Sequence, residues 1–480
     1  MRCSLFEDDC HTKTLKAIVM TLIKSISGIR GTIGGKPGEG LSPFDILKFT
    51  SAYGTWLQQK NNAKKLYLVI GRDARISGEI VNSLVIATLR SLGIQVVDLG
   101  LSTTPTVEMA VTMEKAHGGI ILTASHNPKE WNALKLLNEK GEFISGEDGA
   151  EVLEIAEKGD FEYADIDNLG KLTYDNAYIE KHIEAIIRLP YVDVDAIKKA
   201  DFHIAVDAVN STGGIVVPIL LEALGVEQID GIHCEPTGDF AHNPEPLPEH
   251  LEELSNLIVE KKADLGITVD PDVDRLAFVC EDGSMFGEEY TLVAVADYIL
   301  SLKGGATVSN LSSTLALRDV TEKHGFSYYA SAVGEVNVVD KMKSVNAVIG
   351  GEGNGGVILP ELHFGRDALV GIALFLTHLA KFGKKISELR DQYPKYVMSK
   401  NKIALTPETP VDEVLNHIKQ RYNDKEIDTT DGVKIYFDKE WVHLRKSNTE
   451  PIIRIYAESQ SHEKAKALAE KIMNDIQATV

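Results

Sequence analysis

Three carboxylates stand within five residues of one another in the segment VDPDVDR. Asp270, Asp272 and Asp274 follow the apolar run ADLGIT. Carboxylates crowded into a cleft repel one another unless a cation neutralises them, and hard oxygen ligands suit Mg²⁺. A calcium-binding EF-hand is excluded, because Arg275 stands at the sixth place, where that loop needs glycine. A magnesium site is the better interpretation, and a solvated acidic turn is the alternative.

A serine stands in a second polar segment, TASHNP (123–128), directly after the apolar run GGIIL. Backbone N–H groups in such a turn can hold an anion. Ser125 is a weak nucleophile unless a neighbouring group activates it or it already carries a phosphoryl group. Since Ser, His, Asn and Pro are common turn residues, an ordinary turn is the better interpretation of this stretch taken alone.

A glycine-rich segment, GGEGNGG (350–356), also follows an apolar run. Glycine lets a backbone approach a ligand closely, and Glu352 and Asn354 could form hydrogen bonds with the hydroxyl groups of a sugar. Taken alone the segment predicts little, because glycine-rich turns are common in proteins.

Cationic and hydroxyl side chains gather near the C-terminus in RKSNTEPIIR (445–454). Such donors together can hold a phosphate dianion through charge-assisted hydrogen bonds. The alternative is a hairpin loop with scattered basic residues, but the density of donors favours phosphate binding. The candidate donors are Arg445, Lys446, Ser447, Asn448, Thr449 and Arg454. With a hydroxyl nucleophile and a divalent ion, this segment would complete the parts needed for phosphoryl transfer.

Short β-branched runs alternate with helix-length segments, which predicts βαβ units and mostly parallel sheets with sites at the ends of strands. The pattern recurs three times and is followed by antiparallel strands and a closing helix over 461–477. We expect an α/β protein with three similar α/β domains of mixed, mostly parallel sheets and a C-terminal α+β domain. The expected domains are 1–172, 173–284, 285–396 and 397–480. The expected strands lie within 65–71, 94–100, 118–125, 202–210, 263–270, 306–313 and 346–353.

Length and charge limit the classes of protein that this chain could be. Its 480 residues predict about three or four domains. Its net charge of −21 argues against a nucleic-acid or acidic-membrane binder, since those partners need a positive field. A local cluster of Arg and Lys could still hold a small anion.

Cysteine usage and the N-terminus point to a cytoplasmic protein. The four cysteines (Cys3, Cys10, Cys234 and Cys280) are scattered and predict neither a disulfide framework nor a zinc site. No segment reaches the roughly 18 uninterrupted apolar residues of a membrane span. We expect residues 1–19 to be an unfolded or mis-started extension, because Met20 would serve equally well as a start.

The motifs occur in the order and spacing of the α-D-phosphohexomutase superfamily, which this chain resembles. The matching motifs are SGIRGT (27–32), GRDARISGE (71–79), TASHNP, DPDVDR, the glycine-rich segment and RKSNTEP. The resemblance implies four domains around a central cleft and a Mg²⁺-dependent isomerase. Such an enzyme interconverts hexose 6-phosphate and hexose 1-phosphate through a phosphorylated serine and a bound hexose 1,6-bisphosphate.

The resemblance also implies roles for single residues. Ser125 would be the phosphoserine and would hold Mg²⁺ together with Asp270, Asp272 and Asp274. Arg30, His126 and Lys135 would act around the serine, with Arg30 and Lys135 as candidates for acid–base or electrostatic work. The residues that would bind the sugar and its phosphate are Arg275, Glu352, Asn354, Arg445, Ser447, Asn448, Thr449 and Arg454.

Departures from the usual family pattern bear on the substrate. Asn354 and Gly356 stand where many relatives have serine and histidine, and Ala133 stands where glycine is usual. The forms GEGNGG and VGEVNV (333–338) look closest to phosphoglucosamine mutases, so we expect glucosamine phosphate as substrate, with glucose or mannose phosphates as the alternative. A phosphatase with Asp270 as nucleophile and a non-catalytic sugar-phosphate binder are the competing classes. We expect a monomer or a homodimer.

Overall fold

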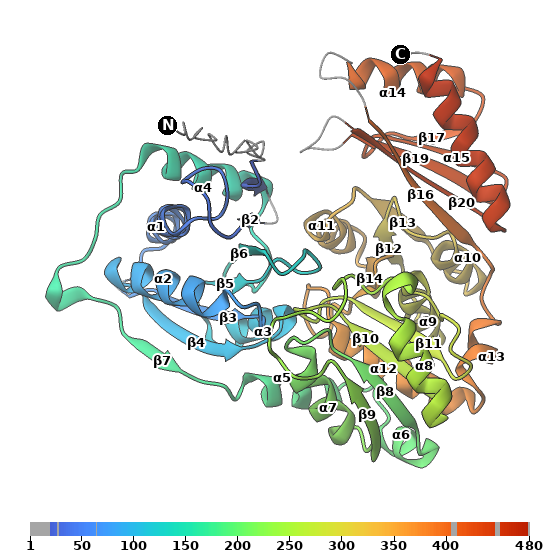
Figure 1. The fold of residues 1–480 in the computed structure, drawn as a ribbon, viewed down its shortest axis with the longest axis horizontal. Helices are drawn as coiled ribbons and strands as arrows, with labels where there is room; N and C mark the ends of the chain where they lie inside the picture. The colour runs from blue at the N-terminus through green and yellow to red at the C-terminus, as the bar shows by residue number, and fades with distance from the viewer. Residues whose placement is uncertain (1–19, 26–27, 64, 405–409, 447–451, 479–480) are drawn as a thin grey trace, which may run out of the picture.

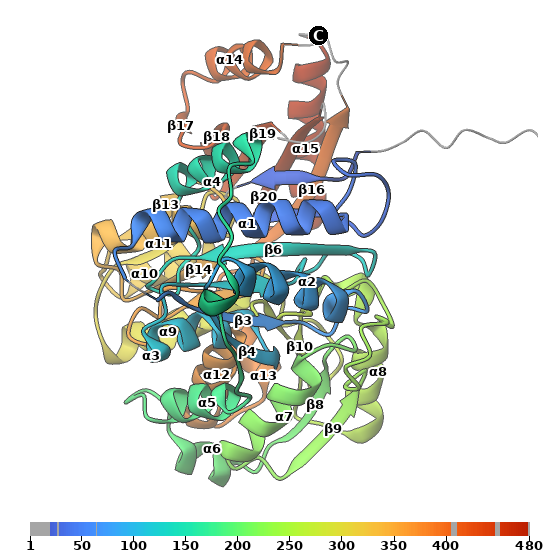
Figure 2. The ribbon, with the colours of Figure 1, turned by 90° about the vertical axis from the view of Figure 1, so that its left-hand side faces the viewer.

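The structure, a computed structural model, describes residues 20–25, 28–63, 65–404, 410–446 and 452–478. These residues form four sheets in succession along the chain, with helices packed against them (Figure 1). Both Figure 1 and the view turned by 90° in Figure 2 place the second and the C-terminal sheets at opposite ends of the molecule, with the third between them. Three mixed α/β sheets followed by an α+β unit confirm the predicted fold class.

The first sheet has seven strands in the order β1-β2-β6-β5-β3-β4-β7. Strands β5, β3, β4 and β7 run parallel, whereas β1, β2, β6 and β5 pair antiparallel. Buried residues of α1, α2 and α4 form one core with this sheet, and those of α3 form a second core. The elements are β1 (Ile23–Ser25), β2 (Gly28–Thr32), α1 (Pro43–Lys60), β3 (Tyr67–Arg72), α2 (Gly78–Ser91), β4 (Gln95–Leu101), α3 (Thr104–Glu114), β5 (Gly118–Leu122), β6 (Trp131–Leu137), α4 (Gly146–Lys158) and β7 (Leu172–Tyr174).

The second sheet has four strands in the order β11-β10-β8-β9, with β11 as its antiparallel edge. Two short 3₁₀ helices, Ile166–Asn168 and Pro248–His250, lie in the connections. The elements are α5 (Tyr178–Ile187), α6 (Val194–Ala200), β8 (His203–Asp207), α7 (Gly213–Ala223), β9 (Gln228–Ile232), α8 (Glu252–Lys261), β10 (Leu265–Val269) and β11 (Leu276–Cys280).

The third sheet repeats this plan, in the order β13-β12-β14-β15 with β15 antiparallel at the edge. One continuous cluster of buried apolar side chains joins it to the second sheet, so these two sheets share a core. The elements are α9 (Glu288–Leu302), β12 (Thr307–Asn310), α10 (Ala316–Lys323), β13 (Tyr328–Ser331), α11 (Glu335–Val345), β14 (Ile349–Glu352), β15 (Gly356–Ile358), α12 (Ala368–Phe382) and α13 (Ile386–Arg390).

The last sheet is wholly antiparallel, in the order β16-β20-β19-β18-β17. It has a core of its own against α14 and α15. The elements are β16 (Val397–Ala404), α14 (Val411–Arg421), β17 (Glu426–Asp428), β18 (Val433–Phe437), β19 (Glu440–Lys446), β20 (Ile452–Ser459) and α15 (His462–Gln477).

The first three sheets place their motif loops by the same connection. The serine loop joins β5 to β6, the acidic loop joins β10 to β11, and the glycine-rich loop joins β14 to β15. In each case a parallel strand ends in the loop, and the chain returns as its antiparallel neighbour. The motifs therefore lie at the carboxyl ends of parallel strands, where α/β sheets place their sites.

Every strand that the sequence predicted before a motif is confirmed, to within a few residues at each end. Directly after the serine motif, Trp131–Leu137 forms β6 between β2 and β5. Arg445 and Lys446 are the last residues of strand β19. None of the helices in the described ranges combines the length and apolar character of a membrane span.

Candidate active site

Ser125 lies in the loop between β5 and β6 and is 8% exposed. Its backbone takes a left-handed conformation, with φ of 47°, which is uncommon for a residue other than glycine. The Ser125 N–H donates to Thr123 Oγ1 at 2.9 Å, and the Thr123 hydroxyl donates to Asp73 Oδ2 at 2.6 Å. These contacts maintain a strained serine conformation of the kind that is common at functional sites.

A fully buried arginine, Arg75, sets the shape of the serine loop. Its guanidinium pairs with Asp73 at 3.0 Å and lies 5.0 Å from the centre of the Phe240 ring. Its other N–H groups donate to four backbone carbonyl oxygens of the loop and of the strand that follows. These belong to Ser125, to Asn127 and Pro128 at 2.7 Å each, and to Trp131 at 3.0 Å. One side chain thus holds both ends of the loop.

The three aspartates of the acidic loop are fully buried and lie close together. At least one carboxylate oxygen of each lies within 4.8 Å of the others. The Ser125 hydroxyl donates to Asp270 Oδ2 at 2.7 Å, so the serine and acidic loops meet. The interpretation of this segment as a solvated turn is wrong, because Asp270, Asp272 and Asp274 have no exposed surface.

The chemistry of these carboxylates fits a divalent cation. Burial, and then the charges of Asp272 and Asp274, raise the pKa of Asp270 well above its usual value. Asp272 Oδ1 and Asp274 Oδ1 are buried and accept no hydrogen bond from any residue in the described part of the chain. Buried carboxylate oxygens without donors are costly unless a cation binds them, and all-oxygen ligands suit Mg²⁺.

Lys135 and Arg275 bring positive charge to the aspartates. Lys135, on β6, lies 2.7 Å from Asp272 Oδ2 and 3.5 Å from Asp274 Oδ2. Burial lowers the pKa of Lys135, but the attraction of the two carboxylates outweighs this and raises it. The Arg275 Nε lies 3.9 Å from Asp270 Oδ2 and from Asp274 Oδ1. Lys135 therefore stays charged, and the Arg275 guanidinium lies with it beside the place where an anion would be transferred.

His126 and Arg30 border the same group of charges. Burial, followed by the charges of Arg275 and Arg366, lowers the pKa of His126 well below its usual value, so its imidazole is neutral. Arg30 lies on β2, where it pairs in register with Ala133 of β6. Burial and the charge of Arg275 lower its pKa. The structure thus brings Ser125 and the three aspartates together with Arg30, His126 and Lys135, which were expected around the serine, and with Arg275, which was expected to bind the substrate.

Arg366 links the glycine-rich loop to the acidic loop. Its guanidinium lies 2.7 Å from Asp274 Oδ2, 2.8 Å from Glu352 Oε2 and 3.1 Å from Glu335 Oε2. Burial raises the pKa of Glu352, but the charges of Arg366 and Arg275 and the hydrogen bonds from Asn310 and the Gly334 N–H together outweigh this and lower it. Glu352 is therefore an ionised hydrogen-bond acceptor, and its position is tied to the three aspartates.

The rest of the glycine-rich loop supports Glu352 and packs on the second sheet. Glu352 accepts hydrogen bonds from Asn310 Nδ2 at 2.8 Å and from Asn354 Nδ2 at 3.4 Å. Gly355 has a φ of 88°, and a Cβ atom there would lie 2.1 Å from the Leu276 carbonyl oxygen. Only glycine allows this close approach, which brings the sugar-binding candidates against the start of β11.

The predicted phosphate-binding segment is described only in part. Ser447, Asn448 and Thr449 lie outside the described residues. Arg445 and Arg454 face each other in register on β19 and β20, and Arg445 Nε lies 2.8 Å from Asp431 Oδ2. Among the described residues, no hydrogen bond or ion pair joins either arginine to the aspartates. The structure therefore does not bring them to the serine.

Sequence analysis missed two residues that shape this site, Arg75 and Arg366. Arg75 was part of a quoted motif but received no role. The available signal was a charged loop directly after strand β3. Arg366 precedes Asp367, which caps α12 by accepting hydrogen bonds from the N–H groups of Leu369 and Val370. A charged Gly-Arg-Asp run directly before a strongly apolar helix was the available signal there.

The arrangement can perform phosphoryl chemistry. It combines a nearly buried hydroxyl, a carboxylate cluster suited to a divalent ion, and cations that stay charged. Positioned charge of this kind is the main contribution that proteins make to phosphoryl transfer.

Four domains of one family match the chain in order. The matching domains are described as phosphoglucomutase/phosphomannomutase, alpha/beta/alpha domain I over residues 22–163, domain II over 177–283, domain III over 287–396, and the C-terminal domain over 401–475. Each segment contains most of one of the four sheets and one of the four motif loops, and of the described strands only β7 and the start of β16 lie outside the matched residues.

Relatives and solved structures cover nearly the whole chain. A phosphoglucomutase/phosphomannomutase of Thermococcus kodakarensis is 37% identical over 446 residues, which are 92% of this chain and 96% of that protein. A phosphoglucosamine/phosphogalactosamine mutase of Sulfurisphaera tokodaii is 31% identical over 456 residues, 93% of this chain and 97% of that protein. The fold is similar to that of a phosphoglucomutase/phosphomannomutase family protein from Burkholderia thailandensis, with a TM-score of 0.79, 22% identity and 96% of each chain covered.

Proposed function

Because the chain belongs to the phosphoglucomutase/phosphomannomutase family, we propose that it is an isomerase that interconverts hexose 6-phosphate and hexose 1-phosphate. The observation that carries this proposal is the Ser125 hydroxyl, which lies 2.7 Å from Asp270 Oδ2 at the edge of the buried aspartate cluster. A serine in this position can receive and return a phosphoryl group next to concentrated charge.

The proposed reaction has two half-reactions at Ser125. In the first, the bond between phosphorus and the serine oxygen breaks while a bond to a sugar hydroxyl oxygen forms, which produces a bound hexose 1,6-bisphosphate. After this sugar has turned over, its other phosphoryl group is transferred to Ser125. When bound by Asp270, Asp272, Asp274 and a phosphoserine oxygen, Mg²⁺ would neutralise charge on the transferring group.

The cations around the aspartates are assigned to the same step. Lys135 and Arg275 keep their charge and would stabilise the transferring phosphoryl group. Arg30 would add a further donor from β2. The neutral imidazole of His126 can donate or accept a hydrogen bond, and we assign it to the orientation of the phosphoryl group or the sugar hydroxyl.

We assign sugar recognition to the third sheet and phosphate recognition to the C-terminal one. Glu352 is an ionised acceptor and Asn354 a neighbouring amide, which suits them to sugar hydroxyl groups. Arg275 lies at the end of the acidic loop, 3.9 Å from Asp274 Oδ1 and 3.4 Å from Glu245 Oε1, and we assign it to the substrate as well. The phosphate that is not transferred would be held by Arg445, Arg454 and the segment that contains Ser447, Asn448 and Thr449.

Glucosamine phosphate is the proposed substrate. Relatives 31–33% identical to this chain carry the name phosphoglucosamine mutase, and Asn354 and Gly356 depart from the common serine and histidine form of the glycine-rich loop. The alternative is glucose or mannose phosphate, which the name of the 37% identical relative favours. A cytoplasmic location suits either substrate, and a monomeric or homodimeric state stays a prediction.

The experiment that tests the function is a substrate panel followed by ³¹P NMR. The full chain, Mg²⁺ and a trace of hexose 1,6-bisphosphate are mixed separately with glucosamine 6-phosphate, glucose 1-phosphate and mannose 1-phosphate. We expect fastest interconversion of the glucosamine phosphate, and no interconversion by the Ser125→Ala variant. Faster turnover of glucose or mannose phosphate would replace the substrate and keep the reaction.

The same spectra separate the competing classes of function. A phosphatase with Asp270 as nucleophile would release inorganic phosphate from all three sugars without forming an isomer. It would also keep its activity in Ser125→Ala. A non-catalytic binder would shift the resonances of a bound sugar phosphate and form no product. Either result would contradict the proposed reaction.

A further inference from the structure

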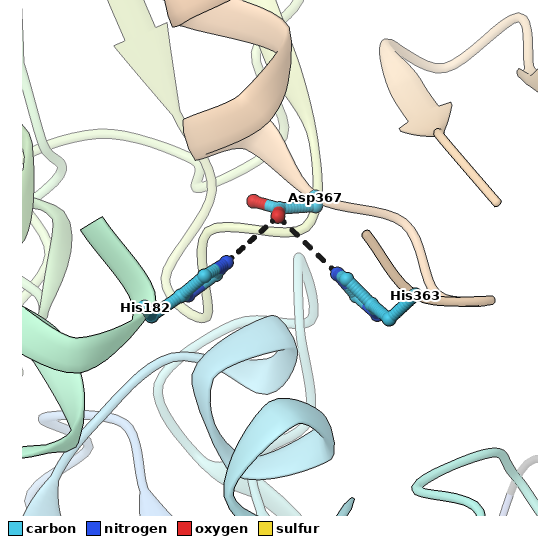
Figure 3. A group of neighbouring side chains, drawn as sticks. All are labelled: His182, His363 and Asp367. Atoms are coloured by element: carbon cyan, nitrogen blue, oxygen red, sulfur yellow. Dashed lines mark hydrogen bonds and ion pairs between the residues drawn. The ribbon is translucent and has the colours of Figure 1, made fainter. Parts of the chain in front are cut away.

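Two histidines and one aspartate form a buried cluster separate from the Ser125 site (Figure 3). His182 comes from α5, whereas His363 and Asp367 come from the segment that leads into α12. Both imidazole Nε2 atoms point at the same oxygen, Asp367 Oδ2, at 3.0 Å for His182 and 3.2 Å for His363. One nitrogen or oxygen atom of each residue lies within 4.8 Å of the others.

The second nitrogen of each imidazole faces a polar group on α3. His182 Nδ1 lies 3.0 Å from Thr106 Oγ1, and His363 Nδ1 lies 3.3 Å from Glu108 Oε2. The other oxygen of Asp367 is held by backbone N–H groups in the first turn of α12. Histidines that bind metals almost always have such a partner on the nitrogen that does not bind. The cluster therefore has inner ligands and outer partners together.

Glu108 is a second, independent sign that a cation is needed here. It is 1% exposed, and apart from the 3.3 Å contact of Oε2 with His363 Nδ1 its carboxylate oxygens accept no hydrogen bond from the described residues. Its carboxylate packs so closely on Gly365 that a Cβ atom there would lie 1.8 Å from Oε2. A buried carboxylate without donors is costly. A proton on His363 Nδ1 could be donated to the Glu108 carboxylate in a hydrogen bond, which would leave Nε2 available to a metal ion.

We propose that His182, His363 and Asp367 bind a divalent transition-metal ion of the zinc class, with Glu108 and Thr106 orienting the two imidazoles. Burial lowers the pKa of His363, but Asp367 and Glu108 outweigh this and raise it to about 10, so a proton on this ring competes with the ion. Once that proton is displaced, two neutral imidazoles and two carboxylates carry two negative charges, which one divalent ion balances. Imidazole ligands favour Zn²⁺ and related metals, whereas the all-carboxylate cluster of Asp270 suits Mg²⁺. The three ligands leave a fourth position for water.

The geometry requires little movement. Bonds of about 2.0–2.2 Å to a tetrahedral ion separate neighbouring ligand atoms by about 3.4 Å. The two nitrogen–oxygen distances here are 3.0 Å and 3.2 Å, so each would lengthen by a few tenths of an ångström. Both imidazole rings and the Asp367 carboxylate would also have to turn, so that the Nε2 lone pairs point at an ion beside Oδ2 and not at Oδ2 itself. Binding would release the Nε2 proton of His363 and would require the proton of a neutral His182 to lie on Nδ1, where it faces Thr106 Oγ1.

The ion would join three parts of the fold. Its ligands and their partners belong to α3, α5 and the segment before α12. Asp367 also follows Arg366, whose guanidinium lies 2.7 Å from Asp274 Oδ2. The metal would therefore stabilise the packing of these segments and the position of Arg366, without contact with the transferring phosphoryl group. This role does not depend on which sugar phosphate the protein uses.

A metal-retention experiment on the full chain tests the site. The protein is stripped with EDTA and given an excess of Mg²⁺ to saturate the aspartate cluster. It is then mixed with a slight excess of Zn²⁺, gel-filtered and analysed for metal. We expect about one Zn²⁺ per chain in the wild type and in Asp270→Asn, and at least a tenfold loss of affinity in His363→Gln. Glu108→Gln should weaken binding by roughly 10- to 100-fold.

His233→Gln is the matched control, because His233 belongs to another histidine and aspartate cluster, with Asp207 and His242. It should keep the bound Zn²⁺. The proposal is overturned if the wild type retains no Zn²⁺, or if folded His363→Gln retains as much as the wild type. A second measurement uses only the wild type, loaded with Co²⁺ and examined by visible absorption. We expect the absorption bands of a four- or five-coordinate Co²⁺ site. A purely octahedral spectrum would contradict the site.

Discussion

The guanidinium of Arg75 donates a hydrogen bond to the backbone carbonyl oxygen of Ser125, fifty residues further along the chain. The same group also binds the carbonyl oxygens of Asn127, Pro128 and Trp131. The left-handed conformation of Ser125 is thus held by a side chain that lies beneath the loop. We regard Arg75 as a positioning residue, because it acts on the nucleophile through the backbone.

Replacement of Arg75 by lysine should show whether Arg75 positions the serine loop for catalysis or only stabilises the fold. Lysine keeps a positive charge for Asp73 but cannot donate to four carbonyl oxygens at once. We expect kcat to fall roughly 10- to 100-fold, with KM little changed and with faster hydrogen exchange in residues 123–131. Wild-type kcat with unchanged exchange in that loop would contradict the assignment. Arg72→Lys, at the end of β3 and without these contacts, is the control.

Asp270→Asn should lose its response to Mg²⁺ while gaining stability without metal. Three buried carboxylates repel one another, and burial with Asp272 and Asp274 raises the pKa of Asp270. Removal of one charge relieves that repulsion. For the wild type, a Mg²⁺ concentration about 100 times Kd should add about 2.7 kcal/mol to the unfolding free energy. Thermal unfolding of EDTA-treated protein with and without Mg²⁺ measures both effects.

An exposed aspartate serves as the control for this comparison. Asp239 pairs with Lys129 at 2.6 Å on the surface, and Asp239→Asn should respond to Mg²⁺ as the wild type does. If Asp270→Asn kept the full Mg²⁺-induced rise in Tm, the aspartate cluster would not be the metal site.

The strands and their motif loops could be predicted from the sequence because their signals are local. An apolar run of four to eight residues followed by polar residues marks both the strand and the end of it, as before Ser125 and Asp270. Burial is not a local property. The sequence therefore left a solvated turn open for the three aspartates, and only the packing of β10, β11 and the serine loop excludes it.

Arg75, Arg366 and the histidine cluster could not be predicted for the same reason. Arg75 binds carbonyl oxygens, which every residue carries, so no residue type marks its partners. Arg366 reaches Asp274 across 92 positions of the chain, and His182 reaches Asp367 across 185. Whether these side chains come into contact depends on how the helices and loops between them pack.

Arg366→Lys should destabilise the protein and reduce its activity together. Arg366 contacts Asp274, Glu335 and Glu352, all of which are buried. A lysine ammonium cannot reach three carboxylates in this geometry, and a buried charge left without its partner is costly. We expect the unfolding free energy to fall by at least about 2 kcal/mol and kcat/KM to fall with it.

A surface arginine provides the comparison for Arg366. Arg188 forms an exposed pair with Glu184 at 2.9 Å, and Arg188→Lys should change the unfolding free energy by less than about 0.5 kcal/mol. Equal effects of the two substitutions would show that the three-way contact of Arg366 is not needed for stability.

The contact between the third and C-terminal sheets contains a buried histidine, His443. Its Nε2 donates to the Asp431 carbonyl oxygen at 2.6 Å, so the neutral ring accepts at Nδ1 from the Ser312 hydroxyl at 3.0 Å. Burial, together with the charges of Lys434 and Arg445, lowers the pKa of His443 to about 4, although the hydrogen bond to the Asp431 carbonyl oxygen and the Asp431 charge act in the opposite direction. The folded protein therefore holds this ring neutral.

Acidification should lower the stability of the folded protein, because His443 binds a proton in the unfolded chain but stays neutral in the folded protein. An unfolded histidine titrates near its model value of 6.5 and the folded one near 4. The unfolded state thus binds more protons between these values, and stability falls as pH decreases through that window. By pH 5 the loss from His443 should reach about 2 kcal/mol.

His443→Gln, which keeps a donor for Asp431, should show a flatter fall of Tm from pH 6.5 to pH 5. His417→Gln, on the exposed side of α14, should keep the wild-type slope. If His443→Gln lost stability as steeply as the wild type, the pH sensitivity would have to come from another group.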